Sequence, residues 1–264
     1  METRTLKNNT TVNFRENTHE YEIIDADGVI HEPRSVTGIL KVAMEDFNIG
    51  AMAGRKNLRE TLIESARFIS ENDKYPIHFE HLSDFVSWLQ DLNKEAVTKW
   101  GQGASRGSEV HDYIECYAKG LKPKFSNDEH IKMLQESVLN WYKERVEETL
   151  SVEKLVYSKE PLYAGKYDLE AIVKDYGRCL VDYKTGSSLS YSQKFPIQLC
   201  AYMYCILQEE SGNPFGRLIV HINRDTGVIT ERFYDAKTYV RDLSVWLSIV
   251  NISNYTIDYK KEWK

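Results

Sequence analysis

The chain has 264 residues, of which 42% are hydrophobic and 12% aromatic, so it is long and apolar enough to bury a sizeable core. Lys and Arg number 34 and Asp and Glu number 40, which gives a formal net charge of −6. This balance excludes wholesale disorder and a protein that coats nucleic acid through a uniformly basic surface, but it permits a local basic groove.

The sequence predicts a protein without membrane contact. No apolar run approaches the roughly 20 residues that span a bilayer, and the segment from Met1 to Phe14 is too polar for a secretory signal. The cysteines form no Cys-x-x-Cys pair and are too few for a disulfide scaffold, so we expect them to be reduced and mostly buried. They are Cys116, Cys179, Cys200 and Cys205.

The N-terminal half is predicted to hold a short hairpin and then mainly helices. Tyr21 to Asp25 and Val29 to His31 carry β-branched or aromatic residues around a Gly-containing turn. Between Gly50 and Gly120 the apolar residues recur at helical spacing. Ser126 to Glu129 resembles a capping box, which opens a helix running towards Leu150.

From Ser151 the hydrophobic period changes from helical to alternating, and the chain ends in a polar tail. We expect strands at about Ser151–Ser158, Ala164–Val173 and Arg178–Lys184, a helix at about Lys194–Leu207, a hairpin of Leu218–Asn223 with Val228–Tyr234, a last helix over Ala236–Val250 and a tail from Asp258 to Lys264.

The simplest organisation is a single α+β domain over residues 1–264. Residues 1–150 supply the hairpin and the helical region, and residues 151–264 supply the sheet. We find no internal repeat, low-complexity tract or Pro/Ser-rich linker that would divide the chain.

The most informative stretch is the hairpin that contains Asp168, Asp182 and Lys184. If the chain turns around Asp175 to Gly177, residues whose numbers sum to about 350 face each other, so the two aspartates lie side by side with Lys184 on the same face. Paired carboxylates repel unless a cation intervenes, and Mg²⁺ suits them and phosphodiester hydrolysis. The alternative is an exposed hairpin with a cross-strand Asp–Lys pair.

Two further pairs lie one helical turn apart. His111 and Glu115 share one helix face and could offer an imidazole and a carboxylate to a metal, although a lone helical His is more often packed or solvated. Gln198 and Tyr202 have the same spacing and could reach a phosphate or a base. By itself this second pair is weak evidence.

Taken in order, these pieces resemble a known nuclease family. The set Gly107-x₃-His111-x₃-Glu115, Gly165-x₂-Asp168, Asp182-x-Lys184-Thr185 and Gln198-x₃-Tyr202 is similar to the RecB-like branch of the PD-(D/E)XK nuclease superfamily. Each piece is common, but their order and spacing between Arg106 and Tyr202 are specific. The resemblance implies a restriction-endonuclease-like core, a central mixed sheet flanked by helices.

The resemblance also implies roles for individual residues. His111, Asp168 and Asp182 would be metal ligands, with the backbone carbonyl of Tyr183 as a further ligand, and Lys184 would be the catalytic lysine. The catalytic set implied is His111, Glu115, Asp168, Asp182 and Lys184. The residues implied to lie near DNA are Gln198, Tyr202, Thr185 and Arg106, the last in a local basic groove with Arg55, Lys56, Lys184 and Lys194.

Two upstream features add to the resemblance. The stretch from His31 to Gly38 is similar to the Pro-Ser-Val-Thr element of phage exonucleases and their mitochondrial relative, although Arg34 interrupts it here. Ser35 or Thr37 would cap the next helix, whose N-terminus could bind a DNA phosphate, and ordinary capping explains them equally well. Glu153 matches a Glu often seen on the first strand of this branch, or it is a solvated strand residue.

The family resemblance predicts a Mg²⁺- or Mn²⁺-dependent DNA nuclease. We expect an exonuclease acting on free DNA ends in phage-type recombination or replication processing, in the cytoplasm of a bacterial or phage-infected cell, with recombination or replication proteins as partners. A structure-specific endonuclease and a noncatalytic DNA-end-binding protein are the alternatives. We expect no iron–sulfur cluster, because no cysteine lies beyond Cys205.

Overall fold

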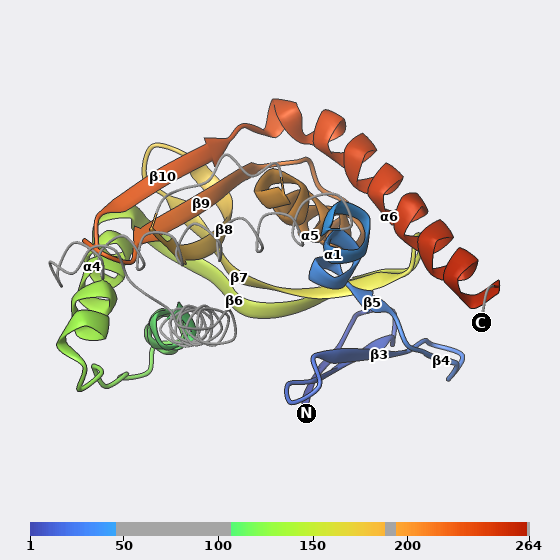
Figure 1. Ribbon diagram of the computed structural model, residues 1–264, viewed down its shortest axis with the longest axis horizontal. Helices are drawn as coiled ribbons and strands as arrows, with labels where there is room; N and C mark the ends of the chain where they lie inside the picture. The colour runs from blue at the N-terminus through green and yellow to red at the C-terminus, as the bar shows by residue number, and fades with distance from the viewer. Residues whose placement is uncertain (46–106, 188–193, 263–264) are drawn as a thin grey trace, which may run out of the picture. The chain divides into compact units, whose positions relative to one another are not determined.

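The computed structural model describes residues 1–45, 107–187 and 194–262 (Figure 1). The chain divides into two compact units, one made of Met1–Ala43 with Glu109–Lys264 and the other of Met44–Ser108. The second unit lies almost wholly outside the described residues, and so do the helices expected between Gly50 and residue 106. The first unit combines helices with two sheets, which confirms the α+β class.

A small antiparallel sheet forms the N-terminal part of the first unit. Its last two strands are the hairpin expected from the sequence, with Ile23 opposite His31. The first two strands were missed, although Val12 and Phe14 alternate with polar neighbours there and pack on Leu155 of the larger sheet. In order, the strands are β1 (Glu2–Thr5), β2 (Thr11–Arg15), β3 (Glu20–Ile24) and β4 (Ile30–His31).

The larger sheet is mixed, because β8 and β9 pair in parallel, as do β5 and β7, while the other pairs are antiparallel. Its order is β10-β9-β8-β7-β5, and β6 also pairs with β7. The strands are β5 (Arg34–Ser35), β6 (Val146–Ser158), β7 (Tyr163–Val173), β8 (Gly177–Gly186), β9 (Gly216–Asn223) and β10 (Ile229–Tyr234).

The helices confirm most of the expected positions and correct some boundaries. Residues 107–118 are helical, as predicted. None of the described helices is long and apolar enough to cross a membrane. Besides residues 107–118, the described helices are α1 (Val36–Glu45), α4 (Glu129–Arg145), α5 (Lys194–Glu210), a short 3₁₀ turn (Ala236–Thr238) and α6 (Tyr239–Glu262).

Three of the predicted helix boundaries were wrong. Helix α4 is capped by Asp128 rather than by Ser126, because the Asp128 carboxylate accepts the free N–H groups of His130 and Ile131 at 2.9 and 3.2 Å. It also ends before Leu150, since β6 already begins at Val146 and pairs with Val173. Helix α6 continues through the expected polar tail to Glu262.

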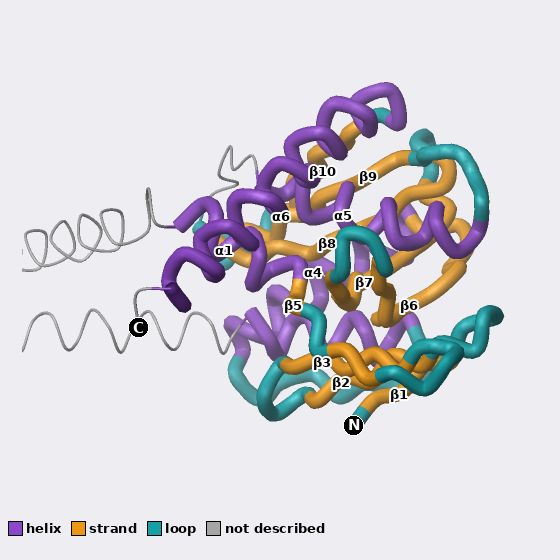
Figure 2. The backbone as a smooth tube through the Cα atoms, turned by 90° about the vertical axis from the view of Figure 1, so that its right-hand side faces the viewer, coloured by secondary structure: helices purple, strands orange, loops and turns teal. Residues whose placement is uncertain are grey.

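Different helices cover the two faces of the larger sheet at β8 and β9. Tyr183 and Val220 point to one face and pack in the same core as Trp141 of α4. Arg217 points to the opposite face, since neighbouring strand residues alternate. There its guanidinium donates to the carbonyl of Pro196 in α5 and pairs with Asp242 of α6 at 2.9 Å. Figure 2 shows α5 and α6 next to each other.

The cysteines belong to this packing, as expected. Cys179, Cys200 and Cys205 are buried free thiols, and Cys116 is half-buried. Burial raises the pKa of Cys205 to about 12, so this thiol stays protonated.

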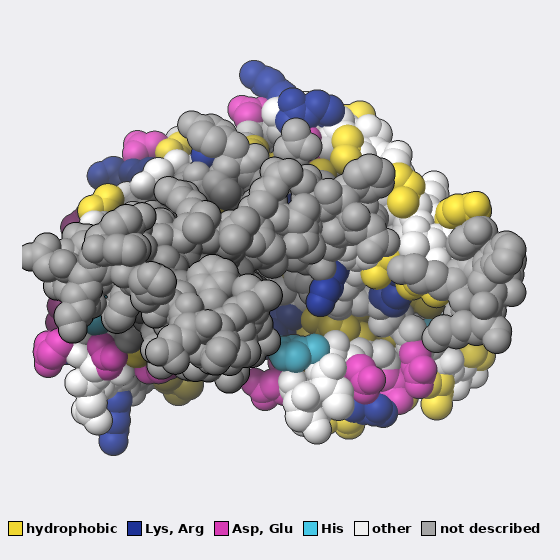
Figure 3. Space-filling model, viewed as in Figure 1, with side chains coloured by type: hydrophobic (Ala, Val, Ile, Leu, Met, Phe, Trp, Pro, Cys, Tyr) yellow, Lys and Arg dark blue, Asp and Glu magenta, His cyan; other side chains and the backbone are white. Residues whose placement is uncertain are grey.

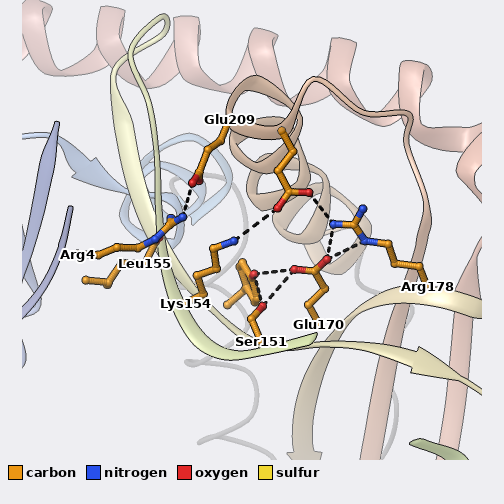
Figure 4. A network of polar contacts seen from close by, with 9 residues as sticks. Arg4, Ser151, Lys154, Leu155, Glu170, Arg178 and Glu209 are labelled. Atoms are coloured by element: carbon orange, nitrogen blue, oxygen red, sulfur yellow. Dashed lines mark hydrogen bonds and ion pairs between the residues drawn. The ribbon is translucent and has the colours of Figure 1, made fainter. Parts of the chain in front are cut away.

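A network of ion pairs ties the N-terminal strand and α5 to the edge of the larger sheet (Figure 4). Arg4 of β1 donates to the carbonyl of Leu155 at 2.6 Å and pairs with Glu209 of α5. Arg178 of β8 bridges Glu170 and Glu210, so one guanidinium joins β7, β8 and α5. The network thus links β1 and α5 to β6, β7 and β8, the strands that carry the candidate site.

Candidate functional site

The two aspartates singled out by the sequence lie at one end of the β7–β8 ladder. Leu169 pairs with Val181 and Val173 with Gly177, so the register is the one predicted from the turn. Asp168 and Asp182 are the next residues beyond the last pair. Because Leu169 and Val181 are buried and apolar, the hydrophobic pattern fixes the register that brings both carboxylates to the same end of the β7–β8 ladder.

Lys184 reaches back along β8 to Asp182. Its Nζ lies 2.8 Å from Oδ1 and 2.6 Å from Oδ2 of that carboxylate, which is only 4% exposed. Burial by itself would lower the pKa of Lys184, but the charges of Asp182 and Asp168 outweigh this effect and raise it. The ammonium group therefore stays charged beside the two aspartates.

His111 approaches the aspartates from the helix of residues 107–118. Its Nδ1 lies 3.8 Å from Oδ2 of Asp168. The same oxygen accepts a hydrogen bond of 2.8 Å from the backbone N–H of Tyr183. The backbone carbonyl of Tyr183 as a metal ligand stays a prediction. Burial lowers the pKa of His111, and the charge of Asp182 offsets this only in part. The neutral imidazole, which is the metal-binding form, is thereby favoured.

The electrostatic balance around Asp168 is unfavourable for a carboxylate. Burial and then the charge of Asp182 raise its pKa, and the ammonium group of Lys184 and the Tyr183 N–H only partly oppose them. Two acids that share a buried space resist ionising together unless a cation joins them. Carboxylates perturbed in this way are commoner at functional sites than elsewhere.

A small hollow connects these residues with Glu115 and Glu153. It is lined by side chains from the 107–118 helix and from strands β6, β7 and β8, which shows that Glu115 lies with His111 and Asp168 of the predicted set. Glu115 also pairs with Lys119 one turn further along the helix. The polar side chains around the hollow are His111, Glu115, Glu153, Asp168 and Tyr183.

The structure brings Glu153 to the site, which the sequence had left open. Its carboxylate lies 2.6 Å from Nζ of Lys166, and burial followed by the charge of Asp168 raises its pKa to about 7. Its φ of 50° lies in the left-handed region, a strained conformation for a residue with a Cβ. Sequence reasoning missed Lys166, although it precedes Asp168 by two and therefore shares its strand face.

The side chains around Asp168 are the candidate ligands of the predicted Mg²⁺ or Mn²⁺ ion. Within residues 1–45, 107–187 and 194–262, no three His, Cys, Asp or Glu side chains already converge as a metal-binding group. Two repelling carboxylates and a neutral imidazole are nevertheless ligands that these ions accept. Binding requires Asp182 to share its carboxylate with Lys184. The residues thus fit the ion by their chemistry, and the metal site stays a prediction.

The Gln198–Tyr202 pair lies on α5, where Gln198 Nε2 donates to the Tyr202 hydroxyl at 3.2 Å. The ring of Tyr202 is buried against Gly165, so closely that a Cβ at residue 165 would lie 2.4 Å from its Cε1. Two pieces of the motif set are therefore in contact, and the glycine is explained by close packing. Contact of Gln198 and Tyr202 with DNA stays a prediction.

Ser35 caps α1, as the sequence predicted. Its Oγ accepts the N–H of Gly38 at 2.9 Å and lies 3.3 Å from Oγ1 of Thr37. A cavity of about 660 Å³ opens beside this cap. Figure 3 shows basic, acidic and His side chains together where Figure 1 places β3 and β5. Residues that line the cavity include Arg15, Tyr21, Glu22, Arg34, Ser35 and Lys41.

The remaining predicted DNA contacts are only partly described. Arg106 lies outside the described residues, as do Arg55 and Lys56 of the expected groove. Lys194 begins α5. Thr185 follows Lys184 on β8, and its buried hydroxyl has no hydrogen-bond partner within the described part of the chain. A basic groove through these positions stays a prediction.

Comparison with known proteins adds little to this description. No protein-family model matches the chain, and no curated protein matches it. Among the solved structures that match is one titled "Crystal structure of SSO0001", with 19% identity and a TM-score of 0.25. The match covers 46% of this chain and 57% of that one, so the chain spans little more than half of its length.

Proposed function

We propose that the protein is a Mg²⁺- or Mn²⁺-dependent deoxyribonuclease with a PD-(D/E)XK core, acting as an exonuclease on free DNA ends. One observation carries the proposal: the buried carboxylate of Asp182 pairs with Lys184 next to Asp168, and His111 lies beside Asp168. A mixed sheet with helices on both faces is compatible with such a core.

Each residue of the site would have a separate task. His111, Asp168 and Asp182 would hold the ion, which when bound lowers the pKa of water and polarises a phosphodiester. The ammonium group of Lys184 would stabilise the negative charge that develops on the scissile phosphate. Glu115 and Glu153, which line the same hollow, add negative charge that favours a cation.

The preference for DNA ends and for phage-type recombination or replication processing has a different basis. It rests on the order and spacing of the motif set between Arg106 and Tyr202 and on the element around Ser35 and Thr37. The partners would then be DNA ends and recombination or replication proteins. A structure-specific endonuclease and a noncatalytic DNA-end-binding protein are the other outcomes of the test.

The test is digestion of end-labelled linear DNA and of covalently closed circular DNA, each single- and double-stranded, with Mg²⁺, Mn²⁺ or EDTA. We expect linear DNA to be degraded only with metal. Asp182→Asn should be inactive, whereas Asp225→Asn, in an exposed turn, should cleave like the wild type. Nicking of closed circles would replace the exonuclease by an endonuclease, and no cleavage in any condition would leave only a DNA-binding role.

A further inference from the structure

Tyr183 lies between two groups of the candidate site. Its backbone N–H donates to Oδ2 of Asp168 at 2.8 Å. Its ring meets the imidazole of His111 edge to face, with the centroids 6.0 Å apart and the planes at 76°. One residue therefore contacts both the carboxylate and the imidazole that face each other at 3.8 Å.

The ring of Tyr183 is itself backed by Trp141 of α4. The two rings are perpendicular, at 89°, with centroids 5.9 Å apart, and both are buried. The indole N–H of Trp141 donates to Oε1 of Glu231 at 2.6 Å, and Arg145 donates to the same oxygen at 2.9 Å. The rings of Tyr183 and Trp141 therefore lie in a row behind His111, and hydrogen bonds to Glu231 hold the Trp141 ring in place.

Packing, more than hydrogen bonding, orients the imidazole. Among the described residues, the imidazole of His111 makes no hydrogen bond, and its Nδ1 lies 3.8 Å from Oδ2 of Asp168, which is longer than a hydrogen bond. The hydroxyl of Tyr183 is buried and has no hydrogen-bond partner in the described part of the chain. What Tyr183 contributes here is therefore the shape of its ring.

We propose that Tyr183 and Trp141 are positioning residues, whose edge-to-face rings hold the His111 imidazole beside Asp168. The inference rests on the proposed function only in that His111 binds the ion. A metal ligand held in one orientation loses less conformational freedom on binding, so residues that orient it raise metal affinity. Without the rings, His111 should sample other rotamers and bind the ion more weakly.

The test measures binding of Mn²⁺ alone by isothermal titration calorimetry. Tyr183→Leu should weaken binding about tenfold, and Tyr183→Phe, which keeps the ring, should restore it. The control is Tyr113→Leu, which removes a buried ring on the same helix as His111 that stacks on Phe125, away from the site. Trp141→Phe, which cannot donate to Glu231, should give a smaller loss than Tyr183→Leu.

A purely structural role is separated by a double-mutant cycle with His111→Ala. If Tyr183 acts through the imidazole, Tyr183→Leu has little further effect once His111 is gone. An equal loss in that background, or wild-type affinity in folded Tyr183→Leu, overturns the inference. In the metal-free wild type, we expect nuclear Overhauser contacts between the rings of His111 and Tyr183, and the absence of these contacts also overturns the inference. A wild type that binds no Mn²⁺ contradicts the proposed function, while these ring contacts still test the positioning.

Discussion

Two clusters of charged side chains in the same unit shift the pKa of their central carboxylates in opposite directions. Glu231 of β10 accepts hydrogen bonds from Trp141 at 2.6 Å, Arg145 at 2.9 Å and Tyr176 at 3.1 Å. Burial by itself would raise its pKa, but these donors outweigh it, and the pKa is lowered. Beside the last pair of the β7–β8 ladder, burial and the neighbouring Asp182 raise the pKa of Asp168.

The difference separates a structural cluster from a candidate functional one. Around Glu231, several donors converge on one carboxylate, so the ionised form stabilises the fold. Around Asp168, Glu153 of β6 pairs with Lys166 of β7, and Asp182 of β8 pairs with Lys184 of the same strand. The two ammonium groups thus already have carboxylate partners, so the ionised form of Asp168 is costly until another cation binds. A cation that binds between the carboxylates removes this electrostatic cost, which favours its binding.

The largest expected effect is loss of cleavage when the acid cluster loses a carboxylate. Asp182→Asn should reduce the cleavage rate by on the order of 10³-fold or more, because the group would hold the ion and orient Lys184. His111→Ala should leave some activity at high Mn²⁺, since imidazole is not the preferred ligand of Mg²⁺. The measurement is single-turnover cleavage, and an Asp182→Asn variant as fast as the wild type would disprove the site.

The next effect separates chemistry from binding at Lys184. Lys184→Ala should slow single-turnover cleavage by on the order of 10²–10³, because a positioned cation acts mainly in the transition state. DNA binding in Ca²⁺ should change little, since phosphate affinity is spread over several cations. If binding fell as far as the rate, Lys184 would be a docking residue instead.

Removing Glu231 should test the structural cluster. Glu231→Ala leaves the indole N–H of Trp141, the guanidinium of Arg145 and the hydroxyl of Tyr176 without their shared acceptor, so we expect a loss of about 2–4 kcal/mol in the free energy of unfolding. The matched control is Glu129→Ala, whose carboxylate is 86% exposed, with an expected change within about 0.5 kcal/mol. Equal urea midpoints for the two variants would contradict the distinction.

Neutralising Asp168 should change the free energy of unfolding in the opposite direction. Asp168→Asn removes one of the repelling charges and still offers an oxygen to the Tyr183 N–H, so the metal-free protein should gain on the order of 1 kcal/mol of stability at pH 7 while losing cleavage. Urea unfolding in EDTA measures the gain. Glu231→Gln, the same chemical change in the other cluster, should destabilise, and a common sign for the two would refute the comparison.

The smallest effect is a dependence of stability on pH. The pKa of Glu231 in the folded protein lies below its ordinary value of 4.5, so its contribution is present above that pH and is lost as the pH falls through the folded-state pKa. The stability difference between the wild type and Glu231→Gln should therefore shrink on acidification below pH 4.5. Urea unfolding at several pH values measures it, and a constant difference would show that ionisation plays no part.

Local features of the sequence predicted much of the larger sheet. The turn at Asp175 to Gly177 and the alternation around it gave the β7–β8 register, because a hairpin register depends on turn position and on which face is buried. The prediction that Ser126 caps α4 was wrong, also for a local reason. Ser126 and Asp128 are both good caps, and the choice depends on where the backbone first turns helical.

By itself, the sequence determined most of the elements and the spacing of Asp168, Asp182 and Lys184 along one hairpin, since turns and periodicity act between near neighbours. Only the tertiary structure decided that Glu153 and its partner Lys166 lie beside Asp168, and that Tyr183 separates His111 from Trp141. These contacts join strands and helices distant in sequence. They depend on how buried faces pack together, which no local pattern specifies.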